Sequence, residues 1–200
     1  MELPIVRARF HQTEWQSMQK LYKKVFRYLM FNLPLIGLIA CSVPPEMRTD
    51  HIPALPRLDL DRYQGVWYEI MRLPNSFEEG LEQVTATYTI QEDDNIKVVN
   101  RGFDPEKGKW DEADGKAWLP DTTKPAELKV SFFWIFSSAY KVIALDQENY
   151  TYAMVTSDSK KYLWILSRTP HMADETLKML QDKAAYYGFE VDKLIKVKQS

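Results

Sequence analysis

Short runs of alternating apolar and polar residues fill the chain from Gly65 to Ser167, and this pattern restricts the fold more than any other feature. Such runs are typical of half-buried β-strands, and turn-forming stretches such as Glu92–Asn95 and Pro120–Pro125 separate them. We expect strands over residues 65–73, 83–91, 96–103, 110–118, 126–134, 140–146, 150–157 and 162–167. Eight strands joined by short connections predict an all-β fold, an eight-stranded up-and-down antiparallel β-barrel, because closure leaves no exposed edge. A β-sandwich is the alternative, but it usually needs some long connections.

One C-terminal α-helix is expected after the last strand, packed outside the barrel. Asp174 and Glu175 place negative charge on its first turn, where the helix dipole favours it, and Gly188 supplies a stop signal. A single apolar stripe runs along this helix and consists of Leu177, Leu180, Ala184 and Tyr187. Acids balance Lys178 and Lys183, so packing on the barrel is favoured over the alternative, binding to a membrane surface.

Charge distribution and cysteine count argue against several classes of protein. The 200 residues include 26 Lys and Arg and 28 Asp and Glu, and residues 1–40 hold six of the bases but only two of the acids. The rest of the chain is therefore acidic, which argues against nucleic acid as a partner because phosphate binding relies on Lys and Arg. Cys41 is the single cysteine and the three histidines lie far apart, so we expect no intrachain disulfide, no metal site and no cofactor.

The first 40 residues end in a segment typical of a secretory signal peptide. Basic residues between Lys20 and Arg27 precede the apolar run Leu29–Ala40, which has about a dozen residues, whereas a membrane-spanning helix needs about 20. A permanent transmembrane helix is therefore the weaker alternative. Residues 1–17 do not fit the signal pattern, so we expect translation to begin at Met18. Peptides from residues 1–17 in the unprocessed precursor would contradict this expectation.

The apolar run ends in Leu38-Ile39-Ala40-Cys41, which resembles the lipobox of bacterial lipoproteins, where the cysteine is lipidated and becomes the mature N-terminus. A Pro-rich polar segment follows, so lipidation is favoured over a buried structural cysteine. Ser42 rather than Asp follows Cys41, which in the lipoprotein pattern implies the outer membrane. The expected organisation is a signal peptide over 1–40, a lipidated N-terminus and irregular tether over 41–57, and a barrel with its helix over 58–200.

Three motifs, in order, resemble the conserved blocks of the lipocalin family. The first is Gly65-x-Trp67-Tyr68-Glu69, in which the glycine permits close backbone approach and the tryptophan adds a rigid apolar body. Taken alone, this motif fits an ordinary edge strand equally well. Residues 140–146 and 164–170 supply the second and third blocks. Together the blocks make residues 58–198 similar to the bacterial outer-membrane lipocalin lipoproteins, relatives of apolipoprotein D, although the disulfides common in animal lipocalins are missing.

The resemblance implies a structural pair at the closed end of the barrel and an apolar interior. In the family, the arginine of the third block, here Arg168, lies across the tryptophan, a contact worth about 0.5–2 kcal/mol. We therefore expect Gly65, Trp67 and Arg168 to be structural residues. Strand alternation places Glu69 and Met71 on the side of Trp67. The family register adds inward positions at Val84, Ala144 and Leu166. The expected ligand-binding residues are Trp67, Glu69, Ala86, Tyr88, Val98, Asn100, Leu128, Val130, Phe132, Tyr140, Val142, Tyr162 and Trp164.

An anchored barrel with such a lining is expected to bind lipids. The resemblance implies storage or transport of fatty acids or (lyso)phospholipids for membrane maintenance under stress. It places the protein on the periplasmic side of the bacterial outer membrane, held by lipidated Cys41. The aromatic run 131–136 is expected to expose Phe133 or Trp134 near the barrel mouth, which favours contact with a membrane or a homodimer.

Two alternative functions follow from the same residues. If side chains fill the barrel, the protein is a purely structural envelope lipoprotein. A hydrolase acting on lipids is the less favoured alternative, because Ser131, Ser137 and Ser138 lack the G-x-S-x-G motif and the isolated histidines offer no obvious base. Acidic residues are plentiful but fall mostly in expected turns, so we expect no catalytic residues.

Overall fold

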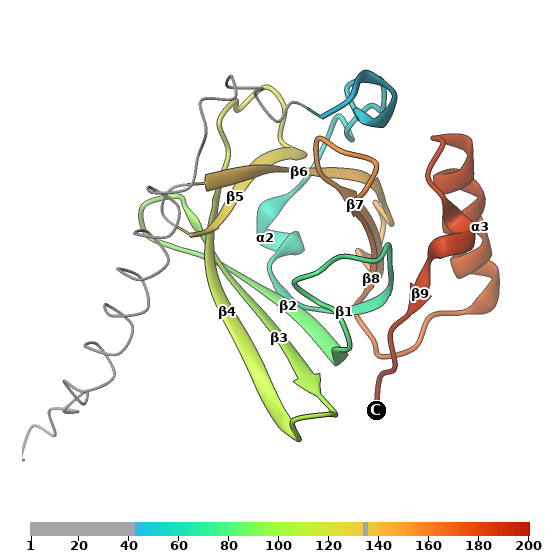
Figure 1. The fold of residues 1–200 in the computed structure, drawn as a ribbon. Coiled ribbons are helices and arrows are strands. Elements are labelled where there is room, and N and C mark those ends of the chain that lie inside the picture. Colours follow the sequence, from blue (N-terminus) through green and yellow to red (C-terminus); the bar gives the residue numbers. More distant parts are fainter. Residues whose placement is uncertain (1–42, 134–135) are drawn as a thin grey trace, which may run out of the picture. The chain divides into compact units, whose positions relative to one another are not determined.

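A computed structural model of the chain describes residues 43–133 and 136–200 (Figure 1). The predicted signal peptide and Cys41 lie outside the described residues, as do the side chains of 133–136, where the sequence predicts an exposed aromatic residue. The elements are η1 (Pro45–Met47), α2 (Leu60–Tyr63), β1 (Gly65–Arg72), β2 (Glu82–Ile90), β3 (Ile96–Asp104), β4 (Lys109–Trp118), β5 (Glu127–Phe133), β6 (Phe136–Leu145), β7 (Tyr152–Thr156), β8 (Leu163–Ser167), α3 (Asp174–Tyr186), η2 (Val191–Lys193) and β9 (Ile195–Lys196).

Strands β1 to β8 form an antiparallel sheet that closes on itself. From β2 to β8 each strand pairs with the next, β8 pairs with β1, and β1 pairs back to β2 from Gly65↔Tyr88 to Tyr68↔Thr85. This closure confirms the predicted eight-stranded barrel and excludes two open stacked sheets. The largest boundary difference is at β6, which begins at Phe136 rather than at Tyr140.

The two ends of the barrel differ. Helix α2 lies within the ring of strands (Figure 1), at the end where β1 begins, and we call this the capped end. The turns at 91–95, 119–126 and 146–151 lie at the same end. The loops at 73–81, 105–108 and 157–162 lie at the opposite end, which we call the mouth.

Among the four register shifts between the described strands, those on β1 and β6 are β-bulges that reverse the inward and outward alternation of side chains. One lies between Glu69 and Met71 on β1, and the other between Val142 and Ala144 on β6. Beyond each bulge the side chains change face, because one extra residue shifts a period of two by one step. Met71 and Ala144 consequently pack in the outer core, and the expectation that they face the interior is wrong.

The C-terminal tail adds a strand that the sequence pattern does not predict. Strand β9 pairs with the mouth half of β1, where β1 no longer pairs with β2. The backbone N–H of Val197 donates to the Ile70 carbonyl at 3.0 Å, and that of Gln83 donates to the Lys198 carbonyl at 2.7 Å. The tail thus bridges β1 and β2 and supplies the hydrogen bonds that their divergence would leave unmade.

Helix α3 packs against the outside of the barrel, as predicted. Leu180 and Ala184 on its apolar stripe are buried, and Gly188, with φ of +79°, follows the end of the helix. The outer core between the helix and the wall comprises Ile52, Ile70, Met71, Leu73, Ile143, Ala144, Met154, Leu163, Ile165, Leu180, Ala184 and Phe189. Within 43–133 and 136–200, no helix is long and apolar enough to cross a bilayer.

Residues 43–58 have more structure than the irregular tether that the sequence predicts. They contain η1 and an isolated β-bridge between Arg48 and Ser159. Ile52 is only 1% exposed and belongs to the outer core. This segment, which we call the strap, is therefore attached to the barrel wall at Arg48 and at Ile52.

Candidate functional site

The capped end of the barrel is closed by an aromatic plug held under an arginine. Trp67 is completely buried, and its indole N–H donates to the Tyr63 carbonyl at 2.8 Å. The guanidinium carbon of Arg168 lies 3.9 Å from the centre of the indole ring, which confirms the predicted stacking. The same guanidinium donates to backbone carbonyls of Arg62, Tyr63, Val66 and Tyr150. Arg168 therefore joins α2, β1 and the β6–β7 turn.

Three tyrosine hydroxyls meet just above this plug. The Tyr140 hydroxyl lies 2.7 Å from that of Tyr63 and 2.9 Å from that of Tyr88. Burial raises the pKa of each phenol well above its usual value, so all three stay neutral. The trio gives the floor of the interior a polar group that is already satisfied by hydrogen bonds.

Above the floor, the interior is lined mainly by apolar and aromatic side chains, and most of the predicted ligand-binding residues lie there. The inner core and the residues packed against it include Trp67, Ala86, Tyr88, Val98, Leu128, Val130, Phe132, Tyr140, Val142 and Trp164. Leu166 also belongs to this core, as predicted. Several of these inward residues keep accessible surface, namely Ala86, Val130, Phe132, Tyr140 and Trp164. Because they face the inside of a closed barrel, their accessible surface indicates room beside them that protein atoms do not fill.

Asn100 contributes an unpaired polar atom to this lining. It pairs with Ala86 across β2 and β3, so its side chain lies on the same inward face. Its Oδ1 is buried and has no hydrogen-bond partner among the described residues. A buried amide oxygen without a partner carries a desolvation cost, and a donor group of a bound ligand would remove that cost.

A buried ionic cluster lies toward the mouth, and the sequence predicts only one of its members, Glu69. Arg72, which turns inward beyond the first bulge, donates to Glu69 Oε1 at 2.7 Å, and both side chains are 4% exposed. Arg72 also donates to the Glu78 carbonyl at 2.5 Å, while the Glu78 carboxylate accepts from Trp164 Nε1 at 3.0 Å. Burial, followed by the charge of Glu78, raises the pKa of Glu69 well above its usual value, and Arg72 offsets this only in part.

The ionic cluster holds the 73–81 loop over the mouth end of β8. Asn75 Nδ2 donates to the Glu78 carboxylate at 2.6 Å, and Asn75 Oδ1 accepts from the Glu78 backbone N–H at 2.9 Å. The loop presents Phe77, which is 59% exposed, against Tyr162 and Trp164. Tyr162 stacks on Trp164 just before β8, so the structure places this predicted interior residue at the rim.

Sequence reasoning missed Arg72, Asn75 and Glu78 in the ionic cluster, and Tyr63 at the floor. Strict alternation places Arg72 outside, and only the bulge brings it in. Glu78 falls in a polar loop, where an exposed acid is the usual expectation. A possible signal was the density of loop-forming residues at 74–80, which contain Pro74, Asn75 and Gly80 around a single aromatic residue.

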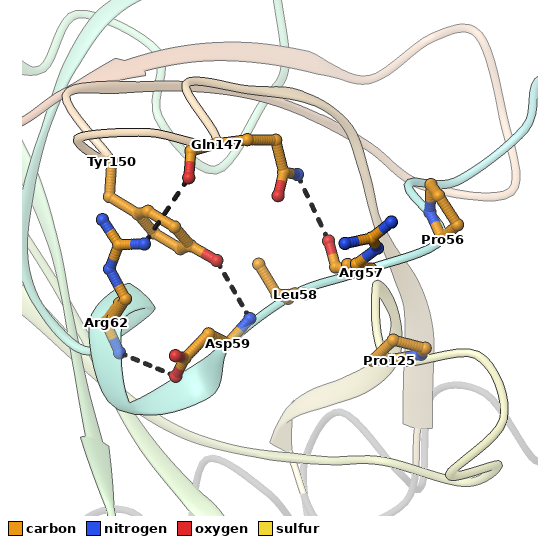
Figure 2. Close-up of a pocket in the computed structure, with 8 residues that line it drawn as sticks. All are labelled: Pro56, Arg57, Leu58, Asp59, Arg62, Pro125, Gln147 and Tyr150. Atoms are coloured by element: carbon orange, nitrogen blue, oxygen red, sulfur yellow. Dashed lines mark hydrogen bonds between the residues drawn. The ribbon is translucent and has the colours of Figure 1, made fainter.

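A separate surface hollow of about 370 Å³ lies at the capped end (Figure 2). Its lining residues are Pro56, Arg57, Leu58, Asp59, Arg62, Pro125, Gln147 and Tyr150. The polar groups here already bond to one another: the Tyr150 hydroxyl accepts from Asp59 N–H, and Gln147 Nε2 donates to the Arg57 carbonyl (Figure 2). These bonds hold the end of the strap against the β6–β7 turn. The polar residues of the hollow therefore have a structural role that requires no ligand.

No group of three or more His, Asp or Glu side chains in 43–133 and 136–200 is placed to hold a metal ion. Three carboxylate residues are buried in the described chain, and all are engaged: Glu69 and Glu78 by Arg72, Asn75 and Trp164, and Asp104 by the backbone N–H groups of Glu106 and Lys107. The arrangement is suited to enclosing an apolar molecule and presenting polar groups near its two ends.

A closed eight-stranded barrel, plugged by a tryptophan under an arginine and flanked by one C-terminal helix, defines the chain as a lipocalin. The profile of the lipocalin-like domain matches residues 58–199, and the chain belongs to the lipocalin family. This membership places it among binding proteins rather than enzymes.

Among individual proteins, the chain is similar to bacterial and animal lipocalins. It is 44% identical to the outer membrane lipoprotein Blc of Escherichia coli over 174 residues, covering 84% of this chain and 97% of the relative. It is 36% identical to bovine (Bos taurus) apolipoprotein D over 152 residues, covering 72% and 78% of the two chains. Among solved structures, the cockroach allergen Per a 4 has a TM-score of 0.59 and 25% identity over 74% of this chain and 92% of its own. The sequence-based resemblance to outer-membrane lipocalins and apolipoprotein D is thus confirmed.

Proposed function

We propose that this protein is an outer-membrane lipoprotein that holds a lipid acyl chain inside its barrel. The observation that carries the proposal is the inner lining, which is apolar and aromatic and keeps accessible surface although it faces inward. Each methylene that enters such a lining gains about 0.8 kcal/mol, so a single long chain can supply micromolar affinity or better after the costs of binding are met.

The polar groups favour fatty acids or (lyso)phospholipids as the ligand class. They lie at separate depths, with the tyrosine trio at the floor, Asn100 midway and the Glu69–Arg72–Glu78 cluster toward the mouth. A molecule with one polar end and one or two apolar tails can place its head at the mouth and its tail among Val98, Val130 and Phe132.

The anchor is the second part of the proposal. A lipidated Cys41 would tether the barrel to the outer membrane, facing the periplasm. The similarity to an outer membrane lipoprotein of Escherichia coli supports the anchor and the membrane. Removal of residues 1–40 as a signal peptide belongs to the same proposal. A tethered barrel of this kind would store or carry lipids during membrane maintenance, including under stress.

Native mass spectrometry of residues 43–200, purified from a bacterial host, tests the binding. We expect a bound mass that matches a fatty acid or phospholipid, displaceable by a fluorescent acyl probe. Ala86→Trp, which fills the interior, should weaken probe binding at least ~10-fold, since steric exclusion removes several methylene contacts. Thr89→Trp, on the exposed face of the same strand, should leave it unchanged.

Two results would favour the other functions. A folded barrel that carries no lipid and takes up no probe indicates a structural lipoprotein. Turnover of an added lipid ester that Ala86→Trp abolishes would indicate a hydrolase.

A further inference from the structure

The strap runs along the barrel wall from the mouth to the capped end. At the capped end, Gln147 Nε2 in the β6–β7 turn donates to the Arg57 carbonyl at 3.3 Å, and just before it the Leu55 N–H donates to the Val142 carbonyl on β6 at 3.0 Å. Midway, the Lys141 ammonium donates to the carbonyls of Thr49 and Ile52 at 3.1 and 3.2 Å. Since Ile52 is also buried in the outer core, this part of the strap cannot leave the wall without breaking several contacts.

Met47, Arg48 and Thr49 of the strap are fixed to the β7–β8 loop at the mouth. The Thr49 hydroxyl is buried and donates to the Ser157 carbonyl at 2.6 Å, and the Thr49 N–H donates to the Asp158 carbonyl at 3.2 Å. The Lys160 N–H donates in turn to the Met47 carbonyl at 2.7 Å. The N-terminal part of the strap, at Met47–Thr49, therefore lies beside the mouth.

Cys41 precedes Met47, the first strap residue bonded to the mouth loop, by six residues in the sequence. Six residues span at most about 20 Å, which is less than the length of the nine residues of β2 that run from the mouth to the capped end, about 30 Å along the strand. A lipid attached to Cys41 would consequently hold the mouth, rather than the capped end, close to the bilayer.

The distribution of exposed apolar side chains between the two ends agrees with a mouth that lies close to the bilayer. Among the six large apolar side chains that are exposed in the described chain, Phe77, Trp110 and Ile195 lie at mouth-end segments. Trp110 also lies under Arg101, whose guanidinium carbon is 3.9 Å from the ring centre. Exposed aromatic residues beside cationic groups are typical of surfaces that contact the lipid–water interface.

The capped end is acidic by comparison. Its turns at 91–95, 119–126 and 146–149 contain Glu92, Asp93, Asp94, Asp121, Asp146 and Glu148, against a single base, Lys124. The mouth loops at 74–81, 105–108 and 157–162 carry Lys107, Lys160 and Lys161 against four acids, one of which, Glu78, is buried. Anionic lipids attract basic groups and repel acidic ones, so the capped end is the less favourable end to place against them.

We infer that the strap acts as an orientation device that presses the mouth of the barrel against the lipid bilayer, so that a lipid passes between membrane and interior without crossing water. The partner is a lipid surface. This inference rests on the proposed function, since it needs the anchor at Cys41.

Depth-dependent fluorescence quenching on the full-length lipidated protein tests the orientation. Lipidation occupies the only native thiol, so an introduced cysteine can be labelled uniquely. We place one label at Glu79→Cys in the mouth loop and, in a separate protein, one at Glu92→Cys in the β2–β3 turn. Both positions are exposed. In phosphatidylcholine–phosphatidylglycerol vesicles containing a nitroxide lipid, the mouth label should be quenched and the capped-end label should not.

A matched control changes only the strap's connection to the anchor. A flexible insertion of ~15 Gly and Ser residues between Ser42 and Val43 spans roughly 20 Å and frees the barrel to rotate. The difference in quenching between the two labels should then shrink or disappear, while the anchor and barrel stay the same. Retention of the full difference with the long linker would show that the strap does not set the orientation, and would overturn that part of the inference.

The acyl-probe affinity, measured on the same preparations, separates the inference from the proposed function. Equal quenching at both labels, or stronger quenching at Glu92→Cys, overturns the orientation, and unchanged probe binding then leaves the interior site standing. Strong quenching at the mouth without any probe binding supports the orientation and contradicts the lipid-binding function. A protein that lacks lipid on Cys41 and does not float with vesicles overturns the orientation.

Discussion

At the scale of single residues, Arg168 shows how one side chain can organise a whole end of the barrel. Its guanidinium covers the face of Trp67 and donates to four backbone carbonyls. Gly65 makes room for it, because a Cβ at this position would lie 3.3 Å from Arg168 Nη1, and its φ of +95° favours glycine. The tryptophan, arginine and glycine thus form one structural unit.

We expect Arg168→Ala to lower the free energy of unfolding by about 1–3 kcal/mol, through loss of the cation–π contact and of charged donors to backbone carbonyls. The free energy of unfolding of Arg168→Lys should lie between those of the wild type and Arg168→Ala, because lysine keeps the charge but not the planar fork of donors. Urea unfolding measures the loss, and the ranking of lipid ligands should stay the same. An unchanged melting temperature in Arg168→Ala would contradict the structural role.

At the scale of elements, each strand next to α3 serves two cores at once. Val155 on β7 faces the inner core and Met154 faces the outer core, and the two bulges adjust β1 and β6 so that both faces are used. The helix therefore stabilises the barrel wall from outside, while the interior need not be filled completely.

Leu180→Ala tests this division. Leu180 is fully buried in α3, so its truncation should cost about 2–5 kcal/mol by removing apolar contacts and leaving a cavity. Met179→Ala, at the neighbouring position that is 42% exposed, should change stability by no more than about 0.5 kcal/mol. Denaturant unfolding of both variants gives the comparison. Equal effects would indicate that α3 contributes little through its buried face.

At the scale of the whole molecule, the dependence of stability on pH combines acids whose pKa is lowered by folding with acids whose pKa is raised by it. Hydrogen bonds, first from Thr151, lower the pKa of Asp146, so its stabilising effect is present above about pH 3.9 and is lost as the pH falls through its folded value. Burial raises the pKa of Glu69, which reverses the sign. Between about pH 4.3 and its higher pKa in the folded state, Glu69 keeps its proton more readily in the folded form than in the unfolded form, so this residue lowers stability as the pH rises through that window.

The Glu69→Gln variant isolates that second contribution. Below about pH 4 the carboxyl is protonated in both states, so the variant and the wild type should have similar free energies of unfolding. As the pH rises, the variant should become progressively more stable relative to the wild type, because it no longer buries a second carboxylate beside Glu78. Chemical unfolding between pH 4 and 8 measures the difference. A variant that loses relative stability as the pH rises would show that pairing with Arg72 outweighs the burial.

The sequence by itself determined the barrel and the outer helix, because these follow from periodicities of two and 3.6 residues and from turn chemistry. The closing tryptophan and arginine and most of the inner lining were implied by the resemblance of three sequence motifs to the lipocalins. Those signals are local, so each segment carries its own. Only the tertiary structure decided that Met71 and Ala144 leave the interior, that Arg72 enters it, and that Glu78 folds into the mouth. It also decided that the strap and β9 lie along the wall, because both find their hydrogen bonds on strands distant in sequence. A bulge or a long-range backbone pairing depends on which strand lies alongside. The alternation of residues within one segment does not specify that neighbouring strand.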